Sequence, residues 1–206
     1  MDSIMRVGIV TGASRGLGLA LVRALRERGW RLAVDARERA GLERATGGLH
    51  GVVPVPGDVT DPDHRQALVA AAGDRVDLVV NNASRLGPSP QPALVDYPLD
   101  ELRRVYEANV LTALALVQLA MPRLTPRAAI LNITSDAAVE PYEGWGGYGP
   151  PRRRWSSSPP SSPPSIRRSA CTRSTPATCA RRCSRTRFPE RTSPTARLRR
   201  RAFRGC

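Results

Sequence analysis

RVGIVTGASRGLG, residues 6–18, joins a short apolar run to a glycine-rich turn. The apolar run over residues 6–11 is typical of a buried parallel strand, and leucines at helical spacing follow it as far as Gly29. A glycine-rich turn between a strand and a helix suits a dinucleotide, because its backbone can approach the pyrophosphate and the helix start offers unpaired N–H groups. This stretch therefore predicts a nucleotide-binding α/β fold.

The same alternation continues along the chain. The pattern predicts further strands over residues 32–34, 52–55, 76–80 and 129–133, and helices over 63–72 and 99–124. Strands that alternate with helices form a parallel sheet covered on both faces, and its ligands bind at the carboxyl ends of the strands. We expect a Rossmann-like doubly wound sheet that is truncated after the fifth strand.

The composition changes sharply after Tyr148. Residues 1–148 hold 16 arginines against 17 acidic residues, whereas residues 149–206 hold 16 arginines against Glu190 alone. The net charge of +14 is thus a property of the tail, and it does not make the whole protein a nucleic-acid binder. We predict a nucleotide-binding domain over 1–148 with a partial active site, and an Arg/Pro/Ser-rich tail over 149–206 whose composition is typical of disorder.

Cysteine usage and hydropathy exclude several classes. All four cysteines lie in the tail without metal-ligand spacing, so the sequence predicts neither a disulfide framework nor a metal site. No apolar run approaches the ~20 residues of a membrane-spanning helix, and no secretory signal precedes the domain. We expect a cytoplasmic protein without a membrane partner.

Five motifs in order resemble those of the classical short-chain dehydrogenase/reductase family. They are a Thr-Gly-x-x-x-Gly-x-Gly turn, an Asp-Val pair, an Asn-Asn-Ala-Gly motif with serine in the last place, an asparagine in the long helix, and a serine 13 residues before a tyrosine. The resemblance implies a cofactor site made by Thr11, Gly12, Ser14, Arg15, Gly16, Leu17, Gly18, Asp58, Val59, Asn82, Ala83 and Ser84. It implies a catalytic site made by Asn109, Ser135 and Tyr148.

The charges after the second predicted strand favour NADP(H), with NAD(H) as the alternative. NAD enzymes place an acidic residue there to accept from the ribose hydroxyls, whereas NADP enzymes place an arginine that meets the extra phosphate. Arg37 occupies that region and Arg15 adds positive charge in the turn. Asp35 argues the other way.

The resemblance also implies hydride transfer between the cofactor and a small carbonyl or alcohol substrate. Tyr148 would exchange the proton on the substrate oxygen, Ser135 would hydrogen-bond that oxygen, and a lysine four residues after the tyrosine would favour the phenolate. Asn109 would support that lysine through a water. Here Arg152 stands in the place of the lysine, and a guanidinium does not reproduce an ammonium.

The prolines after Tyr148 predict that the family's long catalytic helix cannot form. The loss of one base just after the codon for Gly149 would explain this sequence. In the restored reading frame, plausible G/C-rich codons for Pro150, Pro151 and Arg152 encode Ser-Ala-Lys. Residues 171–178 likewise regroup as Val-Tyr-Ala-Val-Asp-Pro-Gly-Asp, a strand and a Pro-Gly turn. We therefore interpret residues 149–206 as a sequence translated in a shifted reading frame.

Three functions stay open at this point. The first is an NADP-dependent oxidoreductase whose activity in this chain is impaired, and the second is a cofactor-binding pseudoenzyme. The third is a nucleotide-binding domain whose Arg-rich arm binds a polyanion; the few aromatic residues of the tail make nucleic acid an unfavoured partner. The family is commonly oligomeric, but the loss of a helix puts homo-oligomer formation in doubt. Substrate identity and reaction direction are not indicated.

Overall fold

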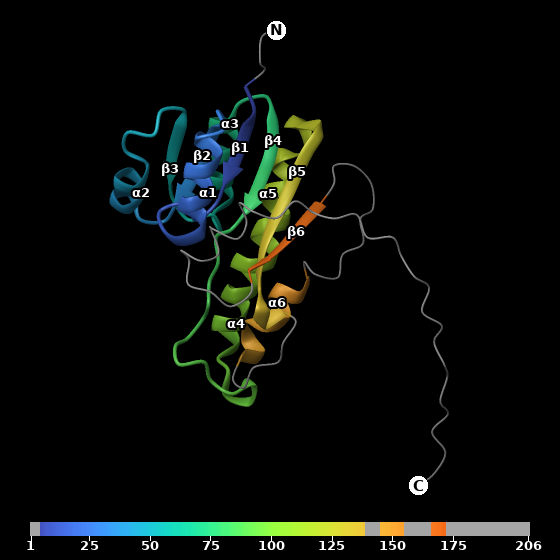
Figure 1. The fold of residues 1–206 in the computed structure, drawn as a ribbon. Helices are drawn as coiled ribbons and strands as arrows, with labels where there is room; N and C mark the ends of the chain where they lie inside the picture. Colours follow the sequence, from blue (N-terminus) through green and yellow to red (C-terminus); the bar gives the residue numbers. More distant parts are fainter. Residues whose placement is uncertain (1–4, 139–144, 155–165, 172–206) are drawn as a thin grey trace, which may run out of the picture.

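A computed structural model describes residues 5–138, 145–154 and 166–171. Within these ranges one parallel sheet has the strand order β3-β2-β1-β4-β5-β6 (Figure 1). Its strands are β1 (Val7–Val10), β2 (Arg31–Ala36), β3 (Val52–Pro56), β4 (Val76–Asn81), β5 (Leu124–Ser135) and β6 (Ile166–Cys171). This order reverses between β1 and β4, where a doubly wound sheet binds its ligand. The predicted fold class is confirmed.

Helices connect the strands and cover both faces of the sheet (Figure 1). They are α1 (Gly16–Arg26), α2 (Arg39–Thr46), α3 (Pro62–Ala72), α4 (Leu99–Tyr106), α5 (Thr112–Ala120) and α6 (Gly149–Arg154). A π-helical turn, Glu107–Leu111, joins α4 to α5, so the long predicted helix is continuous. The sequence pattern missed α2, a short helix with many charged residues.

Two apolar cores lie on opposite faces of the sheet. Ile9 belongs to the core that includes residues of α3 and α5, whereas its neighbour Val10 belongs to the core that includes residues of α1 and α2. Successive side chains of a strand point to opposite faces, so one short apolar strand supplies both cores. Both residues are fully buried. The two cores therefore fix β1 at the centre of the sheet. The turn that follows β1 lies at the carboxyl ends of the parallel strands.

The sheet extends one strand beyond the predicted truncation. β6 pairs in parallel with β5, in a register that runs from Ile130 opposite Ile166 to Ser135 opposite Cys171 (Figure 1). Ladder hydrogen bonds come from the main chain, and an edge strand offers a row of unpaired N–H and C=O groups to any extended segment. Composition alone does not reveal such pairing. The rest of the tail, residues 155–165 and 172–206, lies outside the described residues.

A short helix forms directly after Tyr148, and the sequence pattern did not predict it. Pro150 and Pro151 are the second and third residues of α6. The first four N–H groups of a helix have no intrahelical acceptor, so proline is tolerated there. The helix is described as far as Arg154, so the prediction that the family's long catalytic helix cannot form stays a prediction.

The helical segment Leu99–Arg123 is, among the described residues, long and apolar enough to cross a membrane, judged by length and composition alone. The statement that no apolar run approaches this length was therefore too strict. A core helix passes the same test, and Leu116 and Ala120 of this segment are fully buried in the core. The apolar length is thus a weak indication of a membrane span.

Candidate cofactor and active site

The glycine-rich turn after β1 is held against the end of β2. Gly12 has a φ of +67°, a conformation that favours glycine, and its N–H donates to Asp35 Oδ1 at 2.7 Å. The N–H of Ala13 donates to the backbone carbonyl of Asp35 at 2.8 Å. A Cβ on Gly18 would lie 2.2 Å from the carbonyl oxygen of Gly12, so this position has no room for a side chain.

The outer side of the same turn is open. Gly16 has a φ of +58°, and a Cβ built there would meet nothing within 4 Å. Arg15, the residue before α1, makes no side-chain cap, and the first turn of α1 contains no acidic residue. These features fit an anion such as a pyrophosphate, because the N–H groups at the start of α1 lack a side-chain acceptor and there is space beside them.

Thr11 and Asn82 fasten the turn to the end of β4. The Thr11 hydroxyl accepts from the backbone N–H of Asn82 at 2.9 Å and of Ala83 at 3.0 Å. The Asn82 side chain donates to the carbonyl oxygens of Thr11 and Gly12 at 2.9 and 3.0 Å. Both predicted residues thus stabilise the shape of the turn.

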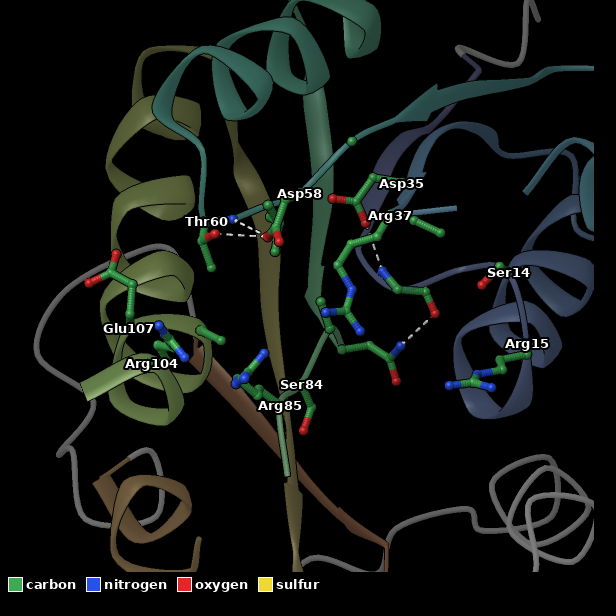
Figure 2. A pocket seen from close by; sticks show the side chains of 17 residues that line it. Ser14, Arg15, Asp35, Arg37, Asp58, Thr60, Ser84, Arg85, Arg104 and Glu107 are labelled. Carbon is green, nitrogen blue, oxygen red and sulfur yellow. Dashed lines mark hydrogen bonds between the residues drawn. The ribbon is translucent and has the colours of Figure 1, made fainter. Parts of the chain in front are cut away.

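A pocket of about 510 Å³ opens over the carboxyl ends of the central strands (Figure 2). Its volume is within the usual range for a ligand site. Nine of the predicted cofactor residues line it: Gly12, Ser14, Arg15, Arg37, Asp58, Val59, Asn82, Ala83 and Ser84. The other four, Thr11, Gly16, Leu17 and Gly18, lie in the turn and at the start of α1 without lining the pocket.

Arginines contribute much of the charge of the pocket. Arg37 is exposed, and Figure 2 shows its side chain extending into the pocket, with Arg15 on one side and Arg85 and Arg104 on another. Burial favours a raised pKa at Asp58, but hydrogen bonds from the Thr60 N–H and hydroxyl and the positive charge of Arg37 outweigh it. The pKa of Asp58 is therefore lower than its ordinary value.

Tyr148 lies beside Arg152, one helical turn further along the chain. Arg152 is only 5% exposed, and its Nε donates to the Tyr148 hydroxyl at 3.1 Å. Its Nη1 donates to the carbonyl oxygen of Ile133 at 2.9 Å, which ties the guanidinium to β5. The Tyr148 hydroxyl also lies 3.4 Å from Oγ of Ser84, a residue of the pocket. The arginine in the lysine's place therefore contacts the phenol directly.

Ser135 and Asn109 are engaged elsewhere. The Ser135 hydroxyl donates to Asp136 Oδ1 at 2.8 Å and accepts from the Ala137 N–H at 3.3 Å. The Asn109 side chain lies in the π-helical turn, where it accepts from the backbone N–H of Arg85 and donates to its carbonyl, both at 2.9 Å. Asn109 thereby holds the backbone of a pocket residue in place.

Comparison with known proteins decides the family. The family model for short chain dehydrogenase matches residues 6–150, well over half of the chain. The chain belongs to the short-chain dehydrogenase family. The chain is 34% identical over 149 residues to 1-deoxy-11-beta-hydroxypentalenate dehydrogenase of Streptomyces arenae, a match that covers 69% of this chain and 52% of that protein.

Other relatives agree with this assignment. Benzil reductase ((S)-benzoin forming) of Saccharomyces cerevisiae is 34% identical, with 70% of this chain and 59% of that protein covered. The crystal structure of the KRED1-Pglu enzyme superposes with a TM-score of 0.68 at 33% identity, covering 73% of this chain and 65% of that one. The chain spans about half to three fifths of the length of the curated relatives it matches.

Several pocket residues were not predicted from the sequence. These are Ala36, Gly57, Thr60, Arg85, Arg104, Glu107 and Ala108, with Asp35 considered only as a counter-signal. Arg85 follows the Asn-Asn-Ala-Ser motif directly, so its place was a usable signal. Arg104, Glu107 and Ala108 lie on the long helical segment, and no local pattern shows which side of that segment borders the pocket. Among the described residues no cluster of ligating side chains suits a metal ion.

Proposed function

We propose that this short-chain dehydrogenase is an NADP(H)-dependent oxidoreductase that interconverts a small carbonyl compound and its alcohol. One observation carries the proposal: Ser84 lines the nucleotide pocket, and its Oγ lies 3.4 Å from the Tyr148 hydroxyl. The pocket at the β1–β4 switch point and the proton-donating phenol are therefore contiguous. A cofactor and a substrate bound there would meet beside Tyr148.

The residues of the pocket fit an NADP(H) molecule in a defined orientation. The start of α1 and the turn at Gly12 would hold the pyrophosphate, and Asp58 and Val59 would lie along the adenine. Arg37 and Arg15 would meet the extra phosphate, because an arginine fork binds phosphate oxygens in pairs. Asp35, the counter-signal, already accepts from Gly12, so it is not freely available to ribose hydroxyls.

When bound, the nicotinamide supplies or takes up the hydride at the substrate carbon. During reduction, Tyr148 gives its hydroxyl proton to the carbonyl oxygen, and solvent later returns a proton to the phenolate. During oxidation the phenolate takes the proton from the alcohol. Arg152 donates a hydrogen bond from its Nε to that phenol oxygen and so fixes the position of the hydroxyl beside the pocket.

We further propose that turnover of this chain is slow. A guanidinium that contacts both Tyr148 and the carbonyl of Ile133 holds a fixed position, whereas the family's ammonium would also reach the cofactor ribose. The Ser135 hydroxyl donates its hydrogen bond to Asp136, so it must rotate before it can donate to a substrate oxygen. This second observation also favours the alternative function, which is cofactor binding without turnover.

The test is consumption of NADPH by the purified chain with a panel of carbonyl compounds. Benzil is included because two relatives are named benzil reductases. We expect slow oxidation that Tyr148→Phe abolishes while NADPH still binds. Binding without turnover in the wild type would favour the alternative, and absence of binding would refute the proposed function.

A further inference from the structure

The glycine before Tyr148 is required by lack of space and not by backbone conformation. Gly147 lies outside the left-handed region of φ, so its backbone would accept another residue. A Cβ built on it would nevertheless lie under 3.0 Å from three ring atoms of Tyr97, a separation that real Cβ atoms essentially never show. The ring of Tyr97 therefore packs directly against the main chain that carries Tyr148.

The hydroxyl end of the same side chain packs against a second glycine. A Cβ on Gly87 would lie under 3.0 Å from the Tyr97 hydroxyl oxygen. Gly87 lies three residues after Ser84 in the sequence. Gly147 directly precedes Tyr148. Tyr97 thus lies between two segments, each of which carries one partner of the 3.4 Å contact between Ser84 and Tyr148.

Tyr97 is a buried side chain that the proposed mechanism does not use. It is 5% exposed and does not line the nucleotide pocket, and within the described part of the chain its hydroxyl has no hydrogen-bond partner. Burial and the negative charge of Glu101 raise the pKa of Tyr97, against the positive charge of Arg85. The phenol is therefore neutral at physiological pH, and Tyr97 acts on its neighbours through packing.

The main chain on both sides of Tyr148 is also held by other contacts. A Cβ on Gly149 would lie 2.6 Å from the carbonyl oxygen of Ala137, so the backbone approaches closely there. The N–H of Tyr148 donates to the carbonyl oxygen of Trp145 at 3.1 Å. Because this backbone has little freedom, the Tyr97 ring packed against it limits how closely the phenol of Tyr148 approaches the pocket.

We infer that Tyr97 is a positioning residue: its ring is a spacer that sets the distance between Tyr148 and the nucleotide pocket at Ser84. The inference rests on the proposed function and deepens it, because hydride and proton transfer require cofactor, substrate and phenol in one geometry. A misplacement of about 1 Å can lower a rate by about 100-fold. Loss of the ring should therefore reduce turnover, while NADPH binding stays almost unchanged because Tyr97 does not line the pocket.

The experiment measures kcat with a carbonyl compound and the dissociation constant of NADPH for the full chain and its variants. Tyr97→Phe keeps the ring and removes only the unpartnered hydroxyl, whereas Tyr97→Leu removes the ring. Tyr106→Leu is the matched control, because Tyr106 lies on α4, is 40% exposed and does not line the pocket.

We expect Tyr97→Leu to lower kcat by about 10- to 100-fold and to change the dissociation constant of NADPH by less than about threefold. Tyr97→Phe and Tyr106→Leu should stay within about threefold of the wild type in both quantities. A wild-type kcat in Tyr97→Leu would overturn the inference. Equal losses of kcat and NADPH affinity would also overturn it, because they indicate a general structural role.

Gly147→Ala tests the same contact from the other side. The added methyl group collides with the Tyr97 ring, so kcat should fall. Leucine lacks the outer ring atoms, so the double variant Tyr97→Leu with Gly147→Ala has room for the methyl group. Its kcat should exceed that of Gly147→Ala alone by about tenfold, since residues in contact are not additive. Losses that simply add would contradict a direct contact between the two residues.

A further readout follows the position of Tyr148 without turnover. The four tyrosines of the chain are isotopically labelled in the ring, and Tyr148→Phe identifies the NMR resonance of Tyr148. NADPH should shift this resonance in the wild type, Tyr97→Phe and Tyr106→Leu, and much less in Tyr97→Leu. A shift of wild-type size in Tyr97→Leu would overturn the inference, whether or not the chain turns over a substrate.

The two proposals fail in different ways. A wild type that binds NADPH without turnover would overturn the proposed function alone, and the NADPH-induced shift of the Tyr148 resonance then decides the role of Tyr97. A wild type that does not bind NADPH would overturn both. A thermal unfolding scan of each variant checks that it is folded.

Discussion

Arg152 stands one helical turn after Tyr148 and donates to its hydroxyl, which is the place the family gives to a lysine. A guanidinium and an ammonium differ in shape and in the number of partners they hold, so this difference bears on rate more than on fold. Arg152 is buried and also donates to the carbonyl oxygen of Ile133, so this N–H group is not available to another acceptor.

We predict that Arg152→Lys raises turnover of NADPH with a carbonyl substrate by about tenfold or more, since a hydrogen bond from a charged group that reaches its partner contributes about 1.5–3 kcal/mol. The measurement is kcat with each variant under saturating NADPH. Arg153→Lys, the next residue, is the matched control and should leave kcat unchanged. A kcat of Arg152→Lys at or below the wild-type value would contradict the role given to Arg152.

Arg37 tests cofactor choice at the level of one side chain. It lines the pocket, and its loss removes a charge-assisted bond to phosphate worth about 1.5–3 kcal/mol, or roughly 10- to 100-fold in affinity. We predict that Arg37→Ala weakens NADPH binding by that factor and leaves NADH binding almost unchanged. The control is Arg39→Ala, because Arg39 is exposed and pairs with Glu43 on α2. Equal weakening of both cofactors would count against Arg37 as the phosphate ligand.

The sequence could predict those pocket residues that belong to a motif. Gly12, Ser14, Asn82 and Ser84 carry fixed spacings, and the structure places all four around one pocket. Ser135 shows the limit of spacing, because its hydroxyl forms a local bond to Asp136 that no distance in sequence predicts. The contact of 3.3 Å between His64 Nε2 and Asp35 Oδ2 was not predicted for a related reason: the two residues are 29 positions apart and meet only when α3 packs on β2.

Among the secondary structure elements, Asp77 at the start of β4 joins three strands. Its carboxylate accepts from the Val7 N–H of β1 at 3.0 Å and from the Thr125 hydroxyl of β5 at 2.9 Å, and it pairs with Arg75. Burial raises the pKa of Asp77, but these hydrogen bonds and the charge of Arg75 outweigh it and leave the pKa lowered. The carboxylate thus stabilises the amino ends of the central strands.

We predict that Asp77→Ala lowers the free energy of unfolding by about 1–3 kcal/mol, because it leaves a buried N–H without a partner. The measurement is urea denaturation, with exposed Asp74→Ala as control. A lowered folded-state pKa contributes stability that is complete above the unfolded value near 3.8 and is lost as pH falls through the folded value. The wild type should therefore lose more stability below about pH 4 than Asp77→Ala, and identical pH profiles would rule out this role.

The predicted elements with clear periodicity, such as the strands around β1 and the long helix, are present in the structure. α2 lacked that signal because only Leu42 and Thr46 of its eight residues are buried. β6 and α6 were missed because their signals are not periodic: the first depends on a free sheet edge, and the second on prolines confined to a first helical turn.

At the scale of the whole molecule, the helical segment Leu99–Arg123 leaves an apolar stripe on the surface. Leu111 is 52% exposed and Leu114 is 45% exposed, on the side away from buried Leu116. Large exposed apolar side chains grouped on one face mark an interaction surface. The stripe is therefore a candidate contact for a second copy of this chain, since a helix face can meet its own symmetry mate.

We predict that the wild type sediments as a dimer or larger assembly and that Leu114→Glu shifts it to a monomer, since a buried charge at the contact has no partner. Gln118→Glu is the control, because it places the same charge at a neighbouring exposed position that is already polar. It should leave the assembly unchanged if the effect of Leu114→Glu is specific to the apolar contact. A monomeric wild type in sedimentation velocity would contradict this account of the stripe.

The frame-shift hypothesis concerns the whole of the chain after Gly149. It predicts that resequencing the gene around the codon for Gly149 finds an extra base that restores lysine in place of Arg152. The same bases again would make the arginine a real feature of the protein, and the comparison of Arg152→Lys with the wild type then measures its effect.

The roles proposed for the pocket residues all require that NADP(H) binds at the carboxyl ends of β1 and β4. The most direct test is calorimetric titration of the full chain with NADPH and, separately, NADH at neutral pH. This binding mode predicts saturable binding of both, with NADPH bound about tenfold more tightly because Arg37 and Arg15 meet its phosphate. Tighter binding of NADH, or no saturable binding of either cofactor, would contradict it.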